Sequence, residues 1–263
     1  MKVLFMGDVM GRPGVEAIQT LLPGLLSRHG VDIAIANAEN SDLGAGITPD
    51  TAEALLASGV RLLTSGNHFW SKKQILPWIQ EHPDLLLRPA NYPKGTPGLG
   101  HGLVRLPDGR ALGVINLEGR VFMKPLDNPF LVAQGLVEGL RQQTPCILVD
   151  MHCEATSEKN AMGVFLDGRV SAVVGTHTHV QTADERVLPG GTAFITDVGM
   201  CGPLDSVIGV RKEQSVERFV TERRMPHEVA TGLVYLQGVV VDIDEATGLA
   251  RGIERVRERL PGT

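Results

Sequence analysis

The chain has 263 residues, of which 43% are hydrophobic and 21% are charged, a balance that excludes a disordered or fibrous chain and allows a sizeable core. Its 25 basic and 30 acidic residues give a net charge of −5, which argues against binding to long nucleic acids but allows a local site for one phosphate. The three cysteines are odd in number and form no C-x-x-C pair, which indicates free thiols and a cytoplasmic protein.

Short apolar runs that end in polar or glycine-rich residues recur along the chain, and such runs are typical of buried parallel strands. The first run, Lys2–Met6, is cut by Gly7 and Asp8. It is far too short for a signal peptide or a membrane span, so we expect no membrane association. The predicted strands are Lys2–Met6, Asp32–Asn37, Arg61–Thr64, Ala111–Asn116, Cys146–Met151, Val170–Val174 and Thr192–Thr196, with one or two edge strands in Gly232–Ile243.

Helices are predicted between these strands. The clearest is Pro49–Ala57, because Thr48 can cap it, its proline suits the first helical turn, and Gly59 stops it. The other helices are Gly14–Ser27, which is expected to break or kink near its proline, and Asn128–Gln142.

Strands and helices alternate along the chain, which indicates an α/β fold built in layers. The stretches Arg88–Pro107 and Gly119–Pro129 are predicted to be long functional loops. Because no repeat, low-complexity tract or long linker divides the chain, residues 1–263 are expected to form a single domain.

Potential metal ligands follow the ends of several predicted strands. In an open α/β sheet, ligands bind outside the carboxyl ends of the strands, where residues far apart in sequence converge. Oxygen and imidazole donors suit transition metals such as Fe, Mn or Zn. The residues are Asp8 after the first strand, Glu39 and Asn40 after the second, Asn67 and His68 after the third, His152 after the fifth, and His177 and His179 after the sixth.

His177 and His179 are separated by one residue, so an extended backbone projects both imidazoles to the same side, where they can serve neighbouring metals. The pair alone would also fit two polar loop residues. Taken singly, Asp8, Glu39 and Asn67 fit side chains that bind their own loop backbone equally well. The metal interpretation is favoured because four of the eight histidines follow predicted strands.

Six segments resemble motifs of the calcineurin-like metallophosphoesterases, and within that superfamily the YmdB-like family of bacterial phosphodiesterases. Two departures from the superfamily pattern are typical of the YmdB-like branch: Met10 stands where histidine is usual, and Ala38-Glu39 stands where Gly-Asp is usual. The six segments, which are spread over most of the chain, are Gly7-Asp8-Val9-Met10-Gly11, Asn37-Ala38-Glu39-Asn40, Ser65-Gly66-Asn67-His68, Asp150 to Lys159, Gly175-Thr176-His177-Thr178-His179 and Ile195 to Met200.

The resemblance implies a metallophosphoesterase-type β-sandwich flanked by helices, in α-β-β-α layers, that binds two metal ions. Glu39 would bridge the ions, and Asn40 would fill the place of the missing histidine. Divalent or mixed-valence Fe is expected, with Mn or Zn as alternatives. One ion would be held by Asp8, Glu39, Asn40 and His179, and the other by Glu39, Asn67, His152 and His177.

The implied activity is hydrolysis of small phosphodiesters, namely 2′,3′-cyclic and also 3′,5′-cyclic nucleotides. Two ions about 3.5 to 4 Å apart activate a bridging hydroxide and clamp the attacking and departing oxygens at phosphorus. The resemblance assigns His68 as the proton donor to the departing oxygen, a role that suits an imidazole titrating near neutrality. Such enzymes are often homo-oligomers, and we expect the same here.

Other charged and polar residues lie within or near these motifs. Asp150, Asp197 and Cys153 can orient ligands, although ordinary structural roles are favoured for them. Lys124 and Lys159 are interpreted as solvated side chains rather than as phosphate-binding groups.

Other functions fit the residues less well or stay open. A TIM-barrel amidohydrolase would place H-x-H on its first strand, and an aspartyl-phosphate phosphatase would need D-x-D where this chain has Asp8-Val9-Met10. A phosphomonoesterase, or a regulatory binding module that retains the metal site, would keep the same motifs. Metal-dependent hydrolysis with no binding partner would favour the enzyme, and a tight partner with indifferent activity would favour the module.

Overall fold

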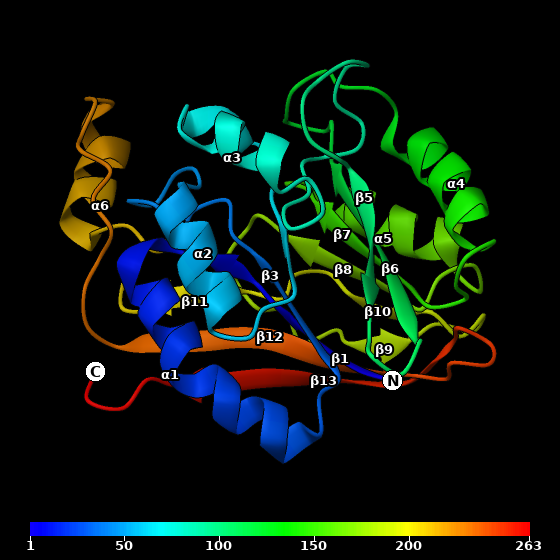
Figure 1. Ribbon diagram of the computed structural model, residues 1–263. Coiled ribbons are helices and arrows are strands. Elements are labelled where there is room, and N and C mark those ends of the chain that lie inside the picture. The colour runs from blue at the N-terminus through cyan, green and yellow to red at the C-terminus, as the bar shows by residue number, and fades with distance from the viewer.

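The computed structural model describes residues 1–263 and contains two β-sheets packed face to face, with helices on both outer faces (Figure 1). The layered α-β-β-α arrangement that the sequence implied is confirmed. No helix combines the length and the apolar character needed to cross a lipid bilayer.

The first sheet has seven strands, six of them in the order β2-β11-β12-β1-β3-β4, with β13 on the other edge of β12. β1 pairs in parallel with β3 and β3 with β4, so these three strands end at the same edge of the sheet. The bounds are β1 Lys2–Met6, β2 Asp8–Val9, β3 Ile33–Asn37, β4 Leu62–Thr64, β11 Met200–Pro203, β12 Val234–Ile243 and β13 Ala250–Arg259.

The second sheet has six strands in the order β5-β6-β7-β8-β10-β9. Strands β6, β7, β8 and β10 are parallel neighbours, and the antiparallel β5 and β9 close the two edges. The bounds are β5 His101–Arg105, β6 Ala111–Glu118, β7 Ile147–His152, β8 Ala172–Thr176, β9 Arg186–Val187 and β10 Ala193–Ile195.

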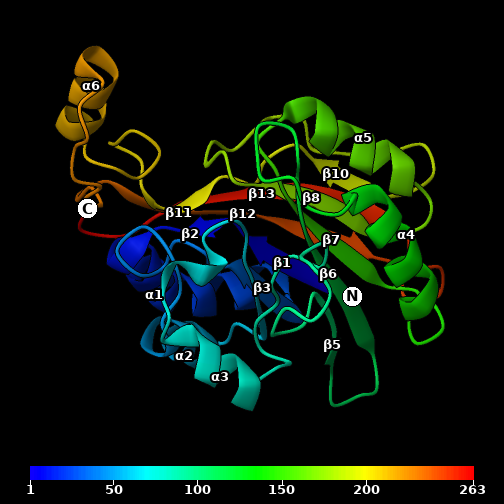
Figure 2. The ribbon, with the colours of Figure 1, turned by 90° about the horizontal axis from the view of Figure 1, so that it is seen from above.

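Three helices and a short 3₁₀ helix follow the strands of the first sheet, two helices cover the second, and one projects from the body (Figure 2). Their bounds are α1 Gly11–His29, α2 Pro49–Ala57, η1 Phe69–Ser71, α3 Ile75–Glu81, α4 Pro129–Leu140, α5 Thr156–Leu166 and α6 Lys212–Thr221. As expected, Thr48 caps α2 by accepting a hydrogen bond from the backbone N–H of Thr51. The projecting helix, α6, has no buried residue.

The alternation of side chains along each strand builds three layers of core. In β1, Val3 and Phe5 point into the interface between the two sheets, whereas Leu4 and Met6 point toward α1 and α2. On the outer face of the second sheet, β7 packs against α4 and α5. Because both faces are covered, the central strands are apolar along their whole length, which is why they were recognisable in the sequence.

Three expectations about the elements were wrong. Gly232–Ile243 is not an edge segment, because β12 has β1 and β11 on one side and β13 on the other. The predicted loop Arg88–Pro107 contains β5, an edge strand in which only Val104 is buried and which shows no apolar run. The first helix was predicted too short, and it continues through Pro23 without a break.

Candidate functional site

The five stretches that follow the strand ends meet at one edge of the sandwich. Asp8, Glu39 and Asn67 come from the first sheet, and His152 and His177 come from the second. Parallel strands direct their carboxyl ends to the same side, and packing the two sheets face to face brings the two sets of ends together. Residues up to 169 positions apart are consequently in direct contact, as the backbone N–H of His177 donates a hydrogen bond of 3.1 Å to Asp8 Oδ2.

His152 is at the centre of the first cluster. Its Nε2 atom lies 2.9 Å from Asn67 Oδ1, 3.0 Å from Glu39 Oε1 and 3.0 Å from His177 Nδ1. All three partners can present lone pairs. A single proton on Nε2 can point at only one of them, whereas a metal ion can accept lone pairs from all, and this donor set therefore fits a cation.

The orientation of the His152 ring is fixed from behind. Its Nδ1 lies 2.9 Å from Thr176 Oγ1, and the Thr176 hydroxyl donates a hydrogen bond of 2.7 Å to Asp150 Oδ1. Because that hydroxyl has its only hydrogen committed to Asp150, the imidazole must be the donor. Nδ1 therefore carries hydrogen, and Nε2 is the atom available to a cation.

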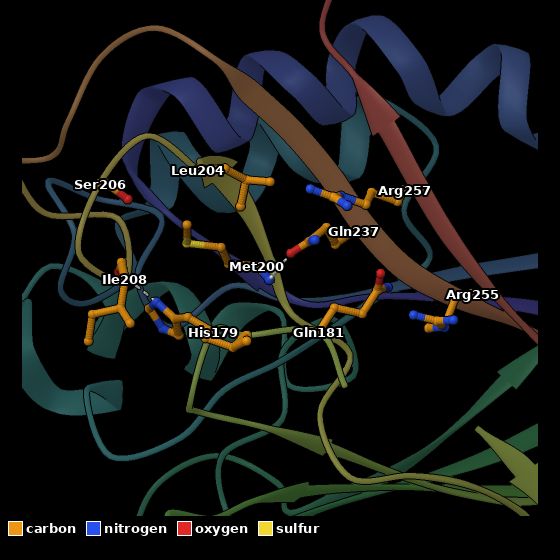
Figure 3. A pocket seen from close by; sticks show the side chains of 10 residues that line it. His179, Gln181, Met200, Leu204, Ser206, Ile208, Gln237, Arg255 and Arg257 are labelled. Atoms are coloured by element: carbon orange, nitrogen blue, oxygen red, sulfur yellow. Dashed lines mark hydrogen bonds between the residues drawn. The ribbon is translucent and has the colours of Figure 1, made fainter. Parts of the chain in front are cut away.

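His179, Asp8 and Asn40 form the second cluster. His179 Nε2 lies 3.7 Å from Asp8 Oδ1 and 3.1 Å from Asn40 Nδ2, and the same Asn40 nitrogen lies 3.4 Å from Glu39 Oε1. His179 Nδ1 donates to the carbonyl of Ile208 at 2.9 Å, which fixes its ring in the same manner (Figure 3). Asp8 Oδ1 is buried and has no hydrogen-bond partner within the protein, so it fits a position where a bound cation would be the partner.

Glu39 joins the two clusters, since its carboxylate contacts His152 on one side and Asn40 on the other. Its second oxygen accepts a hydrogen bond of 3.1 Å from the backbone N–H of His68. Gly66 gives the carboxylate room, because a Cβ atom at that position would collide with His152 and Glu39.

Burial and charge act against each other in this site. Burial raises the pKa of Asp8, and it lowers the pKa of His177, to about 3, together with the positive charge of His152. Burial would also raise the pKa of Glu39, but the charge of His152 and its hydrogen bond lower it to about 2. Burial likewise opposes the charged form of His152, but Glu39 raises its pKa to about 9. The carboxylates thus favour a positive charge between them, which a cation can supply.

His68 lies at the rim of the site. Its imidazole is partly exposed, and its Nδ1 is 3.4 Å from the hydroxyl of Ser71. It has no hydrogen bond through its ring to any of the clustered donors, so the ring is free to contact a bound molecule and to exchange protons with solvent.

Two cavities adjoin the clusters. One, of about 340 Å³, is lined by Asn67 and His177 together with Glu118, Phe122, Met123 and Lys124. The other, of about 390 Å³, lies beside His179 and extends to Arg255 and Arg257 (Figure 3). In the second cavity Arg255 is already paired with Glu185 at 2.8 Å and Arg257 lies over the ring of Tyr235, so its cations are partnered within the protein.

The residues around the motifs have defined structural roles. Asp150 accepts from Thr176, and Cys153 lies buried with its Sγ 3.2 Å from a Glu158 oxygen. The interpretation of Lys159 as solvated was wrong, because it is 1% exposed and its ammonium lies 2.8 Å from Asp197. Lys124 is exposed, with its ammonium 3.4 Å from the carbonyl of Asn67.

Sequence reasoning missed Glu118 and Thr176. In the sheet register Glu118 is opposite His152, and His152 is opposite Thr176, so the three lie side by side on neighbouring strands. Glu118 follows an apolar run in the same way as the other candidates, which was the available signal. Thr176 became recognisable only once the register was known.

The YmdB-like protein family matches residues 4–256 of this chain. The 2′,3′-cyclic-nucleotide 2′-phosphodiesterase of Bacillus subtilis is 49% identical over 256 residues, which cover 97% of this chain and 96% of that protein. A hypothetical protein from Thermus thermophilus superposes with a TM-score of 0.93 at 39% identity, covering 99% of this chain and 100% of that chain.

A second solved structure, described as a novel phosphatase from Mycoplasma pneumoniae, superposes with a TM-score of 0.91 at 37% identity and covers 98% of this chain and 93% of that chain. The matches extend over nearly all of the sequence, and the family match runs from within β1 to within β13 and includes every strand end at the site. The chain therefore belongs to the YmdB-like protein family and is an enzyme of the phosphoesterase class.

Proposed function

We propose that the protein is a dinuclear metal-dependent phosphodiesterase that hydrolyses 2′,3′-cyclic nucleotides and also accepts 3′,5′-cyclic nucleotides. The observation that carries the proposal is the convergence of three lone-pair donors on His152 Nε2, with Glu39 joining this cluster to that of Asp8 and His179. The similarity to the Bacillus subtilis enzyme supports the choice of cyclic nucleotides as substrates.

Each cluster offers the donors for one cation. Glu39 contributes to both, and the unpartnered oxygen of Asp8 suits the cation of the second cluster. Asn40 would present its carbonyl oxygen after a half-turn of its amide, since its nitrogen now faces His179 and Glu39. We assign Asp8, Glu39, Asn40 and His179 to one ion, and Glu39, Asn67, His152 and His177 to the other. Two bound ions lower the pKa of a water molecule and offset charge on the phosphoryl oxygens.

His68 is the proton donor in this proposal. Attack of a water-derived hydroxide on phosphorus breaks the bond from phosphorus to the ribose O2′, and that oxygen must then be protonated as it leaves. The His68 imidazole is partly exposed at the rim and is not engaged with the donor clusters, so it can deliver the proton and be recharged from solvent. The product of this cleavage is the nucleoside 3′-monophosphate.

The test compares wild type with His68→Ala on 2′,3′-cyclic AMP, 3′,5′-cyclic AMP and p-nitrophenyl phosphate. We expect His68→Ala to retain the wild-type metal content, measured by plasma mass spectrometry, and to lose kcat by roughly 10²- to 10⁴-fold on the diesters. His82→Ala is the matched control, because His82 is an exposed histidine that caps the end of α3 outside the site. A fully active His68→Ala variant would refute its role.

The same screen separates the phosphomonoesterase alternative, which the description of the Mycoplasma pneumoniae structure as a phosphatase makes specific. Hydrolysis of p-nitrophenyl phosphate with no turnover of cyclic nucleotides would favour that alternative. Faster turnover of 2′,3′-cyclic AMP would favour the phosphodiesterase.

The remaining expectations are proposals of the same kind. We propose Fe as the native metal, with Mn or Zn as alternatives, because nitrogen and oxygen donors suit all three. A cytoplasmic location is supported by three buried, free cysteines. A homo-oligomer is supported by the exposed apolar side chains of α6, and light scattering would test it. A single cooperative unfolding transition would support one domain over residues 1–263.

A further inference from the structure

We propose that the loop Gly119–Asn128 forms a nucleobase subsite in which Phe122 stacks on the base of the substrate. The inference rests on the proposed function, because it names the part of a cyclic nucleotide that the donor clusters do not hold. Four observations carry it: the cavity, the exposure of Phe122, the hydrogen bonds that anchor the loop, and an unpartnered acceptor that lines the cavity.

The cavity of about 340 Å³ is continuous with the donor clusters, because Asn67 and His177 line it. Its volume is within the range of sites that bind small organic ligands. Phe122, Met123 and Lys124 line the same cavity, so a nucleotide with its phosphate at the clusters could place its base against this loop. The ammonium of Lys124 lies 3.4 Å from the carbonyl of Asn67, which ties the loop to a residue of the donor clusters.

Phe122 buries almost none of its side chain against the rest of the protein. Its side chain is 89% exposed, the largest exposure of any large hydrophobic residue in the chain. Its backbone has φ of 62°, a left-handed conformation that costs free energy for a residue with a large side chain. An exposed aromatic face in a strained conformation beside a reactive centre fits a ligand contact, since every nucleobase has a π-face that stacks on such a ring.

The loop is fixed at both ends by buried side chains. At its start, the carboxylate of Glu158 accepts hydrogen bonds of 3.1 Å from the backbone N–H groups of Arg120 and Val121. Asn91 joins the two ends, because it donates to the carbonyl of Glu118 just before the loop at 2.8 Å and to that of Asp127 near its end at 3.1 Å. Pre-organisation of this kind lowers the entropy lost when a ligand binds.

Glu118 supplies the fourth observation. It is 0% exposed, it lines the cavity, and its Oε2 accepts a hydrogen bond of 3.1 Å from the Tyr92 hydroxyl. Its Oε1 has no partner in the protein. A buried acceptor without a donor is costly, so a donor brought by the ligand, such as an amino or hydroxyl group of the nucleoside, would satisfy it.

The experiment measures binding to the metal-loaded protein by calorimetry, with adenosine 3′-monophosphate and inorganic phosphate as separate ligands. Wild type should bind the nucleotide more tightly than phosphate. Phe122→Ala should weaken nucleotide binding roughly 5-fold to 100-fold, the loss expected for one base–aromatic stack. It should leave the affinity for phosphate unchanged. Phe122→Trp should restore nucleotide binding.

Phe219→Ala is the matched control, because Phe219 is 76% exposed but lies on α6 outside this cavity. Equal affinity of wild type for the two ligands would overturn the subsite. Unchanged nucleotide affinity in Phe122→Ala would also overturn it, including the case in which that variant changes only the oligomeric mass. A protein that binds the nucleotide through Phe122 but hydrolyses no cyclic nucleotide would instead overturn the proposed function alone.

Discussion

Replacing Thr176 with valine removes one hydroxyl while preserving the shape of a fully buried side chain. That hydroxyl accepts a hydrogen bond of 2.9 Å from His152 Nδ1 and donates one of 2.7 Å to Asp150 Oδ1. Valine can do neither. The ring of His152 would lose the contact that holds its Nε2 toward Glu39 and Asn67, so the change tests whether this hydroxyl prepares the site for metal.

The magnitude follows from the groups left unpaired. His152 and Asp150 are both 0% exposed, and each unpaired buried polar group costs about 1 to 3 kcal/mol, giving a loss of about 2 to 6 kcal/mol in the free energy of unfolding. Asp150 keeps its bond from Thr64 to the other oxygen, which limits the damage. Loss of a group that orients a metal-binding histidine lowers metal affinity by about 10- to 100-fold.

Competition with a chelator measures the metal affinity, and denaturant unfolding measures the stability. Thr176→Ser should retain both, because it keeps the hydroxyl. Thr144→Val is the matched control, since the buried Thr144 hydroxyl also makes two hydrogen bonds, to Ala111 and Cys146, but lies away from the site. Wild-type metal affinity in Thr176→Val would refute the reasoning, whereas reduced metal affinity in Thr144→Val would show that lost stability alone explains the effect.

Two further predictions concern charges outside the donor clusters. Lys159→Met should lower the free energy of unfolding by about 3 to 5 kcal/mol, because it leaves the buried carboxylate of Asp197 without its cation; an unchanged denaturation midpoint would contradict this. Although partial burial opposes its charge, hydrogen bonds from Arg110 and Lys2 lower the pKa of Asp32. Asp32→Asn should therefore lower the free energy of unfolding by less than about 1 kcal/mol at neutral pH. The difference in stability from wild type should be lost as the pH falls below about 4, where Asp32 becomes protonated. A difference that persists in acid would exclude the ion pair between Asp32 and Arg110 as the cause.

The elements that were predictable from the sequence are those covered on both faces. Strands such as β1 and β7 appear as unbroken apolar runs because one face meets the other sheet and the other face meets helices. Strand β13 was missed because it is an edge strand rich in arginine and glutamate, of which only Val256 is fully buried. Charged edges of this kind prevent unwanted strand pairing and carry no apolar signal.

The convergence of the candidate ligands was predictable because each follows a strand, and a parallel sheet places such ends together. The side chains that contact these residues could not be predicted, because their contacts depend on strand registers and loop paths that the sequence alone does not give. The contacts of Thr176 and Glu118 with this region follow from the registers of β6, β7 and β8. The hydrogen bond from His179 to the Ile208 carbonyl depends on the path of a loop 29 residues further along the chain.

The central claim is that these side chains hold two cations side by side, and anomalous diffraction from crystals of the Mn-loaded protein tests it most directly. The account predicts two anomalous peaks about 3.5 to 4 Å apart, one beside Asp8 and His179 and the other beside His152 and His177, with the Glu39 carboxylate between them. A single peak, or peaks remote from Glu39, would contradict it.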